Sequence, residues 1–182
     1  MAIKTFTTGE VLTAADTNTY LANSGLVYIK EQTVGNAVTS VTISNAFSST
    51  YDDYRIIYVG GTASTQNDLG VTLGATVANY YFSFTYNSYS NVTGSASVNN
   101  GASWQQAGCQ DNPNHLDCDI FSPFLARITS INTKYVGANT GRVSGSGGGF
   151  LNNTTSYTDL VIRAGAGNFT GGIVYVYGYR KA

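Results

Sequence analysis

The stretch "YYFSFTYNSYS", Tyr80 to Ser90, places aromatic residues at every second position of its first half. A period of two is the side-chain period of a β-strand. One face of this strand would carry Tyr80, Phe82, Phe84 and Tyr86, and the other would carry Tyr81, Ser83, Thr85 and Asn87. We expect the aromatic face to be buried, either in a core or at a subunit interface.

The same kind of pattern recurs along the chain, between turns rich in Gly, Asn and Ser. It predicts further strands at Leu26–Lys30, Ser40–Ser44, Tyr54–Gly61, Val71–Gly74, Phe124–Ser130, Thr133–Val136, Tyr157–Arg163 and Gly172–Tyr179. Many short strands of this kind are typical of a sandwich. No helical segment is long enough to connect parallel strands, which argues against an α/β fold. We therefore predict an all-β fold, an antiparallel β-sandwich that is jelly-roll-like.

Three polar or glycine-rich stretches are interpreted as turns. Asn99–Gly101 is a turn signal of the Asn-Gly type. Gly145–Phe150 and Gly165–Gly172 both lack the third glycine of a dinucleotide-binding motif, and no phosphate-binding lysine follows either of them. Each is predicted to connect two strands.

One short helix is predicted at the front of the chain, in "TGEVLTAADTNTYLAN", Thr8 to Asn23. Thr13 is a good N-cap, and Asp16 stands in the position of a capping-box acid. The helix would run for about three turns and end near Gly25. It is too short to be stable alone, so it must pack on its own head or on another subunit. These features divide the chain into a front segment, 1–24, and a β head, 25–182.

Composition argues against several function classes. Charged residues make up 10% of the chain, the formal net charge is −1, and no run of Lys or Arg exists, so nucleic acid is not an expected partner. No apolar run approaches the length of a membrane span, so membrane insertion is not expected. The adjacent Asp52 and Asp53 would point to opposite faces of a strand, or would cap N–H groups in a turn. We expect no enzymatic activity and no cofactor.

The loop "CQDNPNHLDC" contains both cysteines of the chain, Cys109 and Cys118, and its single histidine, His115. Three states are open for it: a disulfide, two free thiols in a packed loop, or a zinc site with a fourth ligand from Asp111, Asp117 or Asp119. The spacing matches no common zinc pattern, so no metal is predicted. Trp104, in the loop-like "GASWQQAG", and His115 are candidates for recognition at the surface.

Several blocks of sequence resemble a family of bacteriophage proteins. The front motif F-x-x-G-E-V-L-T-A-A-D-x-N, Phe6 to Asn18, resembles the opening of many tail-fibre and minor tail proteins. Further blocks that look like this family are "SNAFSSTYDDYRIIYVGG", "DIFSPF", "LNNTTSYTDLVI" and the terminal "GGIVYVYGYRK". The resemblance implies a component of the virion, with other tail or capsid proteins as partners and a homotrimeric state.

Three functions follow as hypotheses. The first is a non-enzymatic appendage of the virion, whose β head faces outward and contacts a host surface glycan or protein. Its front segment would dock on the particle through the apolar positions Phe6, Val11, Leu12, Tyr20 and Leu21. The second is a capsid decoration or head-fibre protein that ornaments or stabilises the shell. The third is a polysaccharide depolymerase, which would need two acids facing one groove.

Overall fold

The structure, a computed structural model, describes residues 7–16, 25–137 and 143–181. Its elements are α1 (Ala14–Asp16), β1 (Leu26–Thr33), β2 (Ser40–Ile43), β3 (Asp53–Gly60), β4 (Thr62–Ala63), β5 (Asn67–Leu73), β6 (Tyr80–Ser88), β7 (Thr93–Gly101), β8 (Trp104–Gln110), β9 (Asn114–Phe121), β10 (Thr129–Gly137), β11 (Val143–Leu151), β12 (Leu160–Ala164), β13 (Phe169–Thr170) and β14 (Ile173–Tyr179). All paired strands run antiparallel. The predicted all-β antiparallel class with one short helix is confirmed.

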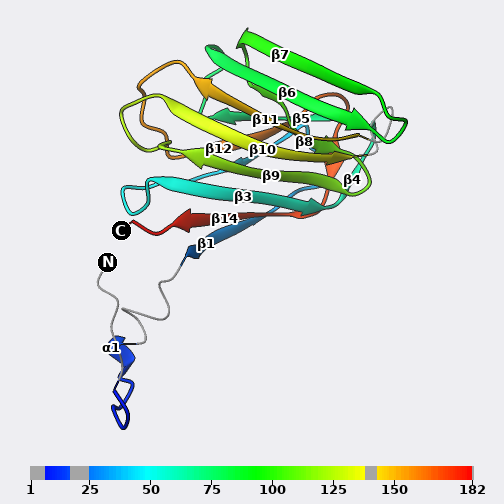
Figure 1. The fold of residues 1–182 in the computed structure, drawn as a ribbon. Helices are drawn as coiled ribbons and strands as arrows, with labels where there is room; N and C mark the ends of the chain where they lie inside the picture. Colours follow the sequence, from blue (N-terminus) through cyan, green and yellow to red (C-terminus); the bar gives the residue numbers. More distant parts are fainter. Residues whose placement is uncertain (1–6, 17–24, 138–142, 182) are drawn as a thin grey trace.

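The strands form two layers (Figure 1). The larger layer has the order β1-β14-β3-β9-β10-β11-β6-β7, and the smaller has the order β2-β12-β5-β8. A hairpin joins β8 to β9, which share one residue pair, Cys109 with His115. The sheet passes from one layer to the other at that hairpin. The short strands β4 and β13 pair separately.

A single core fills the space between the layers. Alternate residues of β3 and β9 point into it: Tyr54, Ile56, Tyr58, Leu116, Cys118 and Ile120. The aromatic strand β6 behaves as predicted, because Tyr80, Phe82 and Phe84 are buried and Tyr86 is half-buried. Tyr80 spans the layers: its ring packs edge-on against Trp104 at 5.1 Å, and its hydroxyl accepts a hydrogen bond of 2.8 Å from the Leu73 N–H.

The turn predicted for the glycine-rich stretch Gly145–Phe150 is wrong, because this stretch is part of the nine-residue strand β11. It pairs with β6 along its whole length, so that Gly145, Gly147 and Gly149 lie opposite Tyr86, Phe84 and Phe82. Aromatic rings can cover glycines on a neighbouring strand, and glycine marks places where groups approach closely. The glycines make room for the rings, and this accounts for a strand in a sequence typical of turns.

Other boundaries also differ from the prediction. Residues 124–128 are not a strand but a turn region, in which the Leu125 N–H donates to Ser122 O, and β10 begins only at Thr129. The turn predicted at Asn99–Gly101 is displaced. β7 continues through Gly101, and the chain turns at residues 102–103, before β8 begins. The loop predicted around the cysteines is the β8–β9 hairpin.

The start of the front helix is confirmed. The Asp16 N–H donates to Thr13 Oγ1 at 3.1 Å, and the Thr13 N–H donates to Asp16 Oδ2 at 3.2 Å, which are the two reciprocal bonds of a capping box. The predicted later turns of the helix lie outside the described residues. Gly25 has a φ of 88°, the left-handed conformation expected there. In the described part of the chain, no helix combines the length and the apolar character needed to cross a membrane.

Candidate functional site

The described docking candidates, Val11 and Leu12, are uncovered. Their exposed fractions are 78% and 48%, and no residue of α1 is buried. The other three candidates, Phe6, Tyr20 and Leu21, lie outside the described residues. The front segment therefore presents apolar side chains that the sandwich does not cover.

The sequence predicts a surface position for Trp104, and this is wrong. Trp104 is one of the most deeply buried of the described side chains. Its exposed fraction is 0%. It begins β8 rather than lying in a loop, and it packs against Tyr80 of the opposite layer. A large aromatic side chain at the start of a core strand gains more from burial than from exposure.

Strand alternation separates His115 from Cys118, two of the three residues considered as zinc ligands. Cys109 and Cys118 are buried, whereas His115 lies on the outer face of β9, where burial alternates along the strand. No disulfide joins Cys109 to Cys118, so the disulfide considered between them is not formed. Within the described ranges, no group of three His, Cys, Asp or Glu side chains could hold a metal ion. Burial, together with the nearby carboxylates of Asp119 and Asp117, raises the pKa of the Cys118 thiol.

Asp52 and Asp53 have structural partners. Asp53 is the first residue of β3 and not part of a turn, but its Oδ1 atom accepts the backbone N–H of Ser122 at 3.1 Å. Asp52 lies 2.8 Å from the Lys181 ammonium. The arrangement does not bring these two carboxylates together across a groove.

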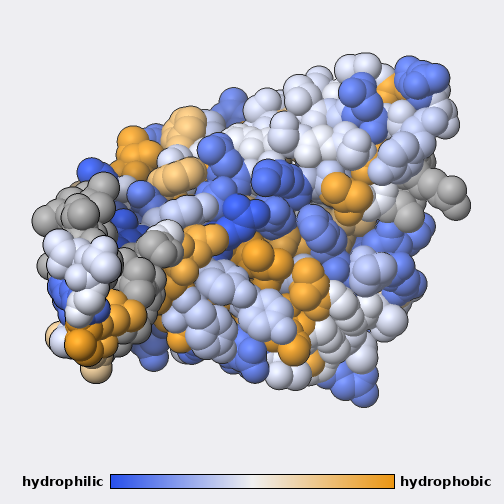
Figure 2. Space-filling model, turned by 60° about the horizontal axis from the view of Figure 1, so that its bottom comes forward, coloured by the Kyte–Doolittle hydropathy of each residue, from blue (hydrophilic) through white to orange (hydrophobic). Residues whose placement is uncertain are grey.

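Tyrosines line the outer face of β1 and β14. Tyr28 is 53% exposed, and its ring meets Tyr177 edge-on at 5.9 Å. Beside them, Arg55 forms a two-bond contact with Asp117 at 2.6 and 2.7 Å. Tyrosine and arginine are enriched at protein interfaces. Figure 2, which brings the β1 end forward, shows apolar patches interspersed with hydrophilic ones rather than one continuous apolar surface.

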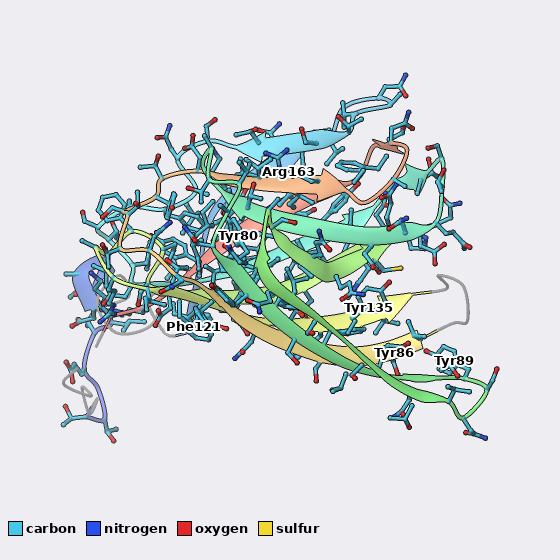
Figure 3. All side chains as sticks on the ribbon, turned by 90° about the horizontal axis from the view of Figure 1, so that it is seen from above. Tyr80, Tyr86, Tyr89, Phe121, Tyr135 and Arg163 are labelled. Carbon is cyan, nitrogen blue, oxygen red and sulfur yellow. The ribbon has the colours of Figure 1, made fainter. Side chains whose placement is uncertain are left out.

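An apolar groove of about 440 Å³ lies at the β8–β9 hairpin. Its lining includes Tyr89, Pro113, His115 and Val136. Tyr89 is 65% exposed, and Figure 3 shows it with Tyr86 at one end of the sandwich. His115, a predicted recognition residue, contributes to this groove, but its Nδ1 atom is buried and has no hydrogen-bond partner among the described residues.

A second, polar recess of about 250 Å³ lies on the outer side of the smaller layer. Its residues come from β5, β8 and β12 and from the positions directly before β8 and after β12: Asn67, Asp68, Gly70, Ser103, Gln105, Gln106, Arg163, Ala164 and Gly165. Figure 3 shows Arg163 on β12, away from Tyr86 and Tyr89. We refer to this group of nine residues as the Arg163 recess.

A β-bulge shapes the Arg163 recess. Leu69 pairs with Gly108 and Val71 pairs with Trp104, so three residues of β8 stand opposite the single Gly70 of β5. One of these three, Gln106, has a φ of 61°, a left-handed conformation that costs a residue with a Cβ about 1–2 kcal/mol. Bulges are over-represented at functional sites, where they re-aim side chains. Here the bulge directs Gln105 and Gln106 to the recess.

Glycine keeps the recess open. Gly70 lies opposite Arg163 in the β5–β12 register, and a Cβ at Gly70 would come within 3.1 Å of Ser103 Oγ. A Cβ at Gly165 would come within 2.5 Å of Asn67 Oδ1. Side chains at either position would therefore intrude on the polar groups of the recess.

The sequence reasoning missed the Arg163 recess. The available signal was local: "SWQQAGC", Ser103 to Cys109, places two adjacent glutamines among otherwise small or apolar residues. Two consecutive glutamines cannot both follow the period of two unless the strand is bulged or exposed. The partner glycine, Gly70, lies more than thirty residues away, so pairing could not be read from the chain.

Comparison with known proteins identifies no family. No family model matches the chain, and no curated protein matches it. Among solved structures, the tripod from the baseplate of bacteriophage Tuc2009 is 14% identical, with a TM-score of 0.26, covering 100% of this chain and 79% of that one. The VP2 subviral particle of infectious bursal disease virus is 10% identical, with a TM-score of 0.15, covering 100% of this chain and 46% of that one. At these TM-scores the likeness says nothing about function.

Proposed function

We propose that this chain is a non-enzymatic structural protein of a bacteriophage particle, of the tail-fibre or minor tail type. In this proposal, the front segment, residues 1–24, docks on the particle. The sandwich is displayed outward, as a homotrimer, and contacts the host surface. The sequence blocks that resemble this phage family, from Phe6 to the terminal "VYGYR", give the proposal its starting point.

The uncovered front segment carries the proposal. Its helix start is organised by its own capping box, and Val11 and Leu12 lie beside that cap with 78% and 48% of their surfaces exposed. Uncovered apolar side chains on a short, locally capped element are what a docking partner would bury. The tyrosine-lined face of β1, which follows directly in sequence, offers further contact surface.

The contacts of the acidic residues in the head favour a binding role over a catalytic one. Asp52 and Asp53 are engaged in structural contacts, and the most acidic strand, β9, presents Asp117 and Asp119 to Arg55. Repetition of the head on one particle would convert weak single contacts into useful avidity.

Deletion of the front segment tests the proposal. Phage carrying a gene that lacks the codons for residues 1–24 would be compared with phage carrying the whole gene, and the protein would be quantified in purified particles by mass spectrometry. We expect the truncated head to fold but to be absent from particles. Full occupancy by the truncated head would exclude docking through this segment.

The copy number distinguishes an appendage from a shell decoration. A few copies per particle, found at the tail by electron microscopy, would support the appendage. A copy number that follows the local three-fold sites of the shell, with loss of shell stability when the gene is deleted, would support the decoration alternative instead.

A further inference from the structure

We infer that the Arg163 recess binds one uncharged sugar ring of a glycan. This inference deepens the proposed function, since it assigns host-surface contact to a particular site and ligand class. It is carried by the polar groups of the recess, by their charge balance and by the bulge that brings them together.

The recess holds polar side-chain groups with no hydrogen-bond partner among the described residues. The guanidinium of Arg163 makes one bond, from Nε to Thr72 Oγ1 at 3.3 Å, which leaves both terminal nitrogens open. The Asn67 side chain accepts the Asp68 N–H, and its amide N–H₂ group has no partner. The same holds for the side-chain groups of Ser103, Gln105 and Gln106. None of these groups is among the buried side-chain atoms without a partner, so they are open to solvent and available to a polar ligand.

The chemistry of these groups favours an uncharged ligand with several hydroxyls. Side-chain amides and hydroxyls both donate and accept, and Arg163 only donates. The Asp68 carboxylate only accepts, and its Oδ1 atom already accepts the Tyr135 hydroxyl at 2.7 Å. A sugar hydroxyl also donates and accepts, so neighbouring hydroxyls on a ring can use such a mixed set. The lining includes both the carboxylate of Asp68, which disfavours an anion, and the guanidinium of Arg163, which disfavours a cation. The recess therefore suits neither an anionic nor a cationic ligand.

The size of the recess limits the ligand to a small unit. Its volume of about 250 Å³ lies just below the ~300–1,000 Å³ of pockets for drug-sized ligands. No aromatic ring lines it, so binding would rest on hydrogen bonds rather than on stacking. We expect weak affinity for a single ring, with a millimolar Kd, which is useful only through repeated display on one particle.

Gln106 provides a variant that separates binding from folding. Glycine adopts a φ of 61° without the strain that glutamine bears, so Gln106→Gly should fold at least as stably as the natural chain. It removes one of the two side chains that the bulge places at the recess. Asn91→Gly is a matched control, because Asn91 has a φ of 62° in the turn between β6 and β7, away from the recess.

The test is NMR titration of the ¹⁵N-labelled full chain with methyl glycosides of glucose, galactose, mannose and N-acetylglucosamine, and with glucuronate and inorganic phosphate. We expect at least one neutral glycoside to shift the side-chain amide signals of Asn67, Gln105 or Gln106. Gln106→Gly should weaken that binding by about tenfold or more, the loss of roughly one or two hydrogen bonds. Asn91→Gly should leave it unchanged.

Four results would each overturn the inference. They are no shift with any neutral glycoside, shifts confined to the apolar groove at the β8–β9 hairpin, binding of glucuronate or phosphate alone, and unchanged binding in Gln106→Gly. None of these depends on the particle. If the purified protein binds a neutral glycoside at the recess but is absent from virions, the proposed function fails and the site stands. If it is present in virions and no sugar binds, the site fails and the proposed function stands.

Discussion

The ring of Phe82 lies against Gly147, so closely that a Cβ atom at position 147 would come within 2.5 Å of Phe82 Cζ. The same relationship repeats along β11. A Cβ at Gly145 would lie 2.9 Å from a ring atom of Phe84, and a Cβ at Gly149 would lie 3.0 Å from Phe82 Cδ2. The bare backbone of β11 is thus the surface on which the aromatic face of β6 packs.

Substitution of Gly147 by alanine should therefore destabilise the sandwich. The added methyl group would meet Phe82 Cζ and also Ser83 O at 2.9 Å, and overpacking of this kind costs about 1–3 kcal/mol. Urea unfolding of the variant and the natural chain would measure the difference. Gly148→Ala is the matched control: its nearest neighbour would be Asn132 Oδ1 at 3.1 Å, a side-chain atom that can move, so we expect a much smaller effect. Equal losses in both variants would contradict this account of β11.

The only tryptophan of the chain should report on folding and not on the surface. Trp104 is fully buried against Tyr80, so its fluorescence should be blue-shifted in the native protein and poorly quenched by acrylamide. Unfolding in urea should shift the emission to longer wavelength and make quenching efficient. Efficient quenching in native protein would show that Trp104 is exposed, as the sequence suggested.

Stability should fall in alkaline solution. Burial raises the pKa of Tyr58 from 10.0 to about 12, and it also raises the pKa of Cys118 above its ordinary value of 9.0. In both cases the unfolded chain loses its proton at a lower pH than the folded chain. These groups therefore leave stability unaffected below about pH 9 and reduce it as the pH rises toward their folded pKa values.

Tyr58→Phe isolates one of these contributions. The variant loses the hydroxyl that donates to Gly171 O at 2.9 Å and accepts from Asn114 at 3.1 Å, so its free energy of unfolding should be lower at neutral pH by about 1–3 kcal/mol. Between pH 10.0 and about pH 12 it should lose stability less steeply than the natural chain. Urea unfolding across this range would measure both slopes, and parallel slopes would refute the assignment.

A separate prediction concerns the front segment. Replacing Val11 and Leu12 together by serine should leave the unfolding of the head unchanged, because both side chains are exposed and α1 buries nothing. The same change should lower the amount of protein in purified particles severalfold. Val77→Ser is the matched control, since Val77 is 59% exposed on the head. Normal incorporation of the double variant would remove these two residues from the docking surface.

The sequence predicts those strands in which polar and apolar residues alternate within the strand itself. β6 and β14 alternate cleanly, and both form as expected. β9 also alternates, with Leu116, Cys118 and Ile120 buried, but Asn, Pro and Asp around it suggested a loop. A closer count of the period would have found it.

Other parts depend on partners distant in the chain. β11 is a strand because the rings of β6 cover its glycines, and no property of "GSGGGF" alone predicts this. The small and polar neighbours of Trp104 predict a surface position, but the side chain packs against Tyr80 of the other layer. The Arg163 recess likewise requires the pairing of β5, β8 and β12, which only the folded chain brings together.

The two buried thiols have a practical consequence. Cys109 and Cys118 are the only cysteines of the chain, and the sandwich closes over both of them. A maleimide reagent reacts with accessible thiolate, so the folded protein should resist labelling. A cysteine introduced at an exposed position such as Val77 would then be the single point of attachment for a fluorophore or a gold cluster, and individual heads could be located on intact particles by light or electron microscopy.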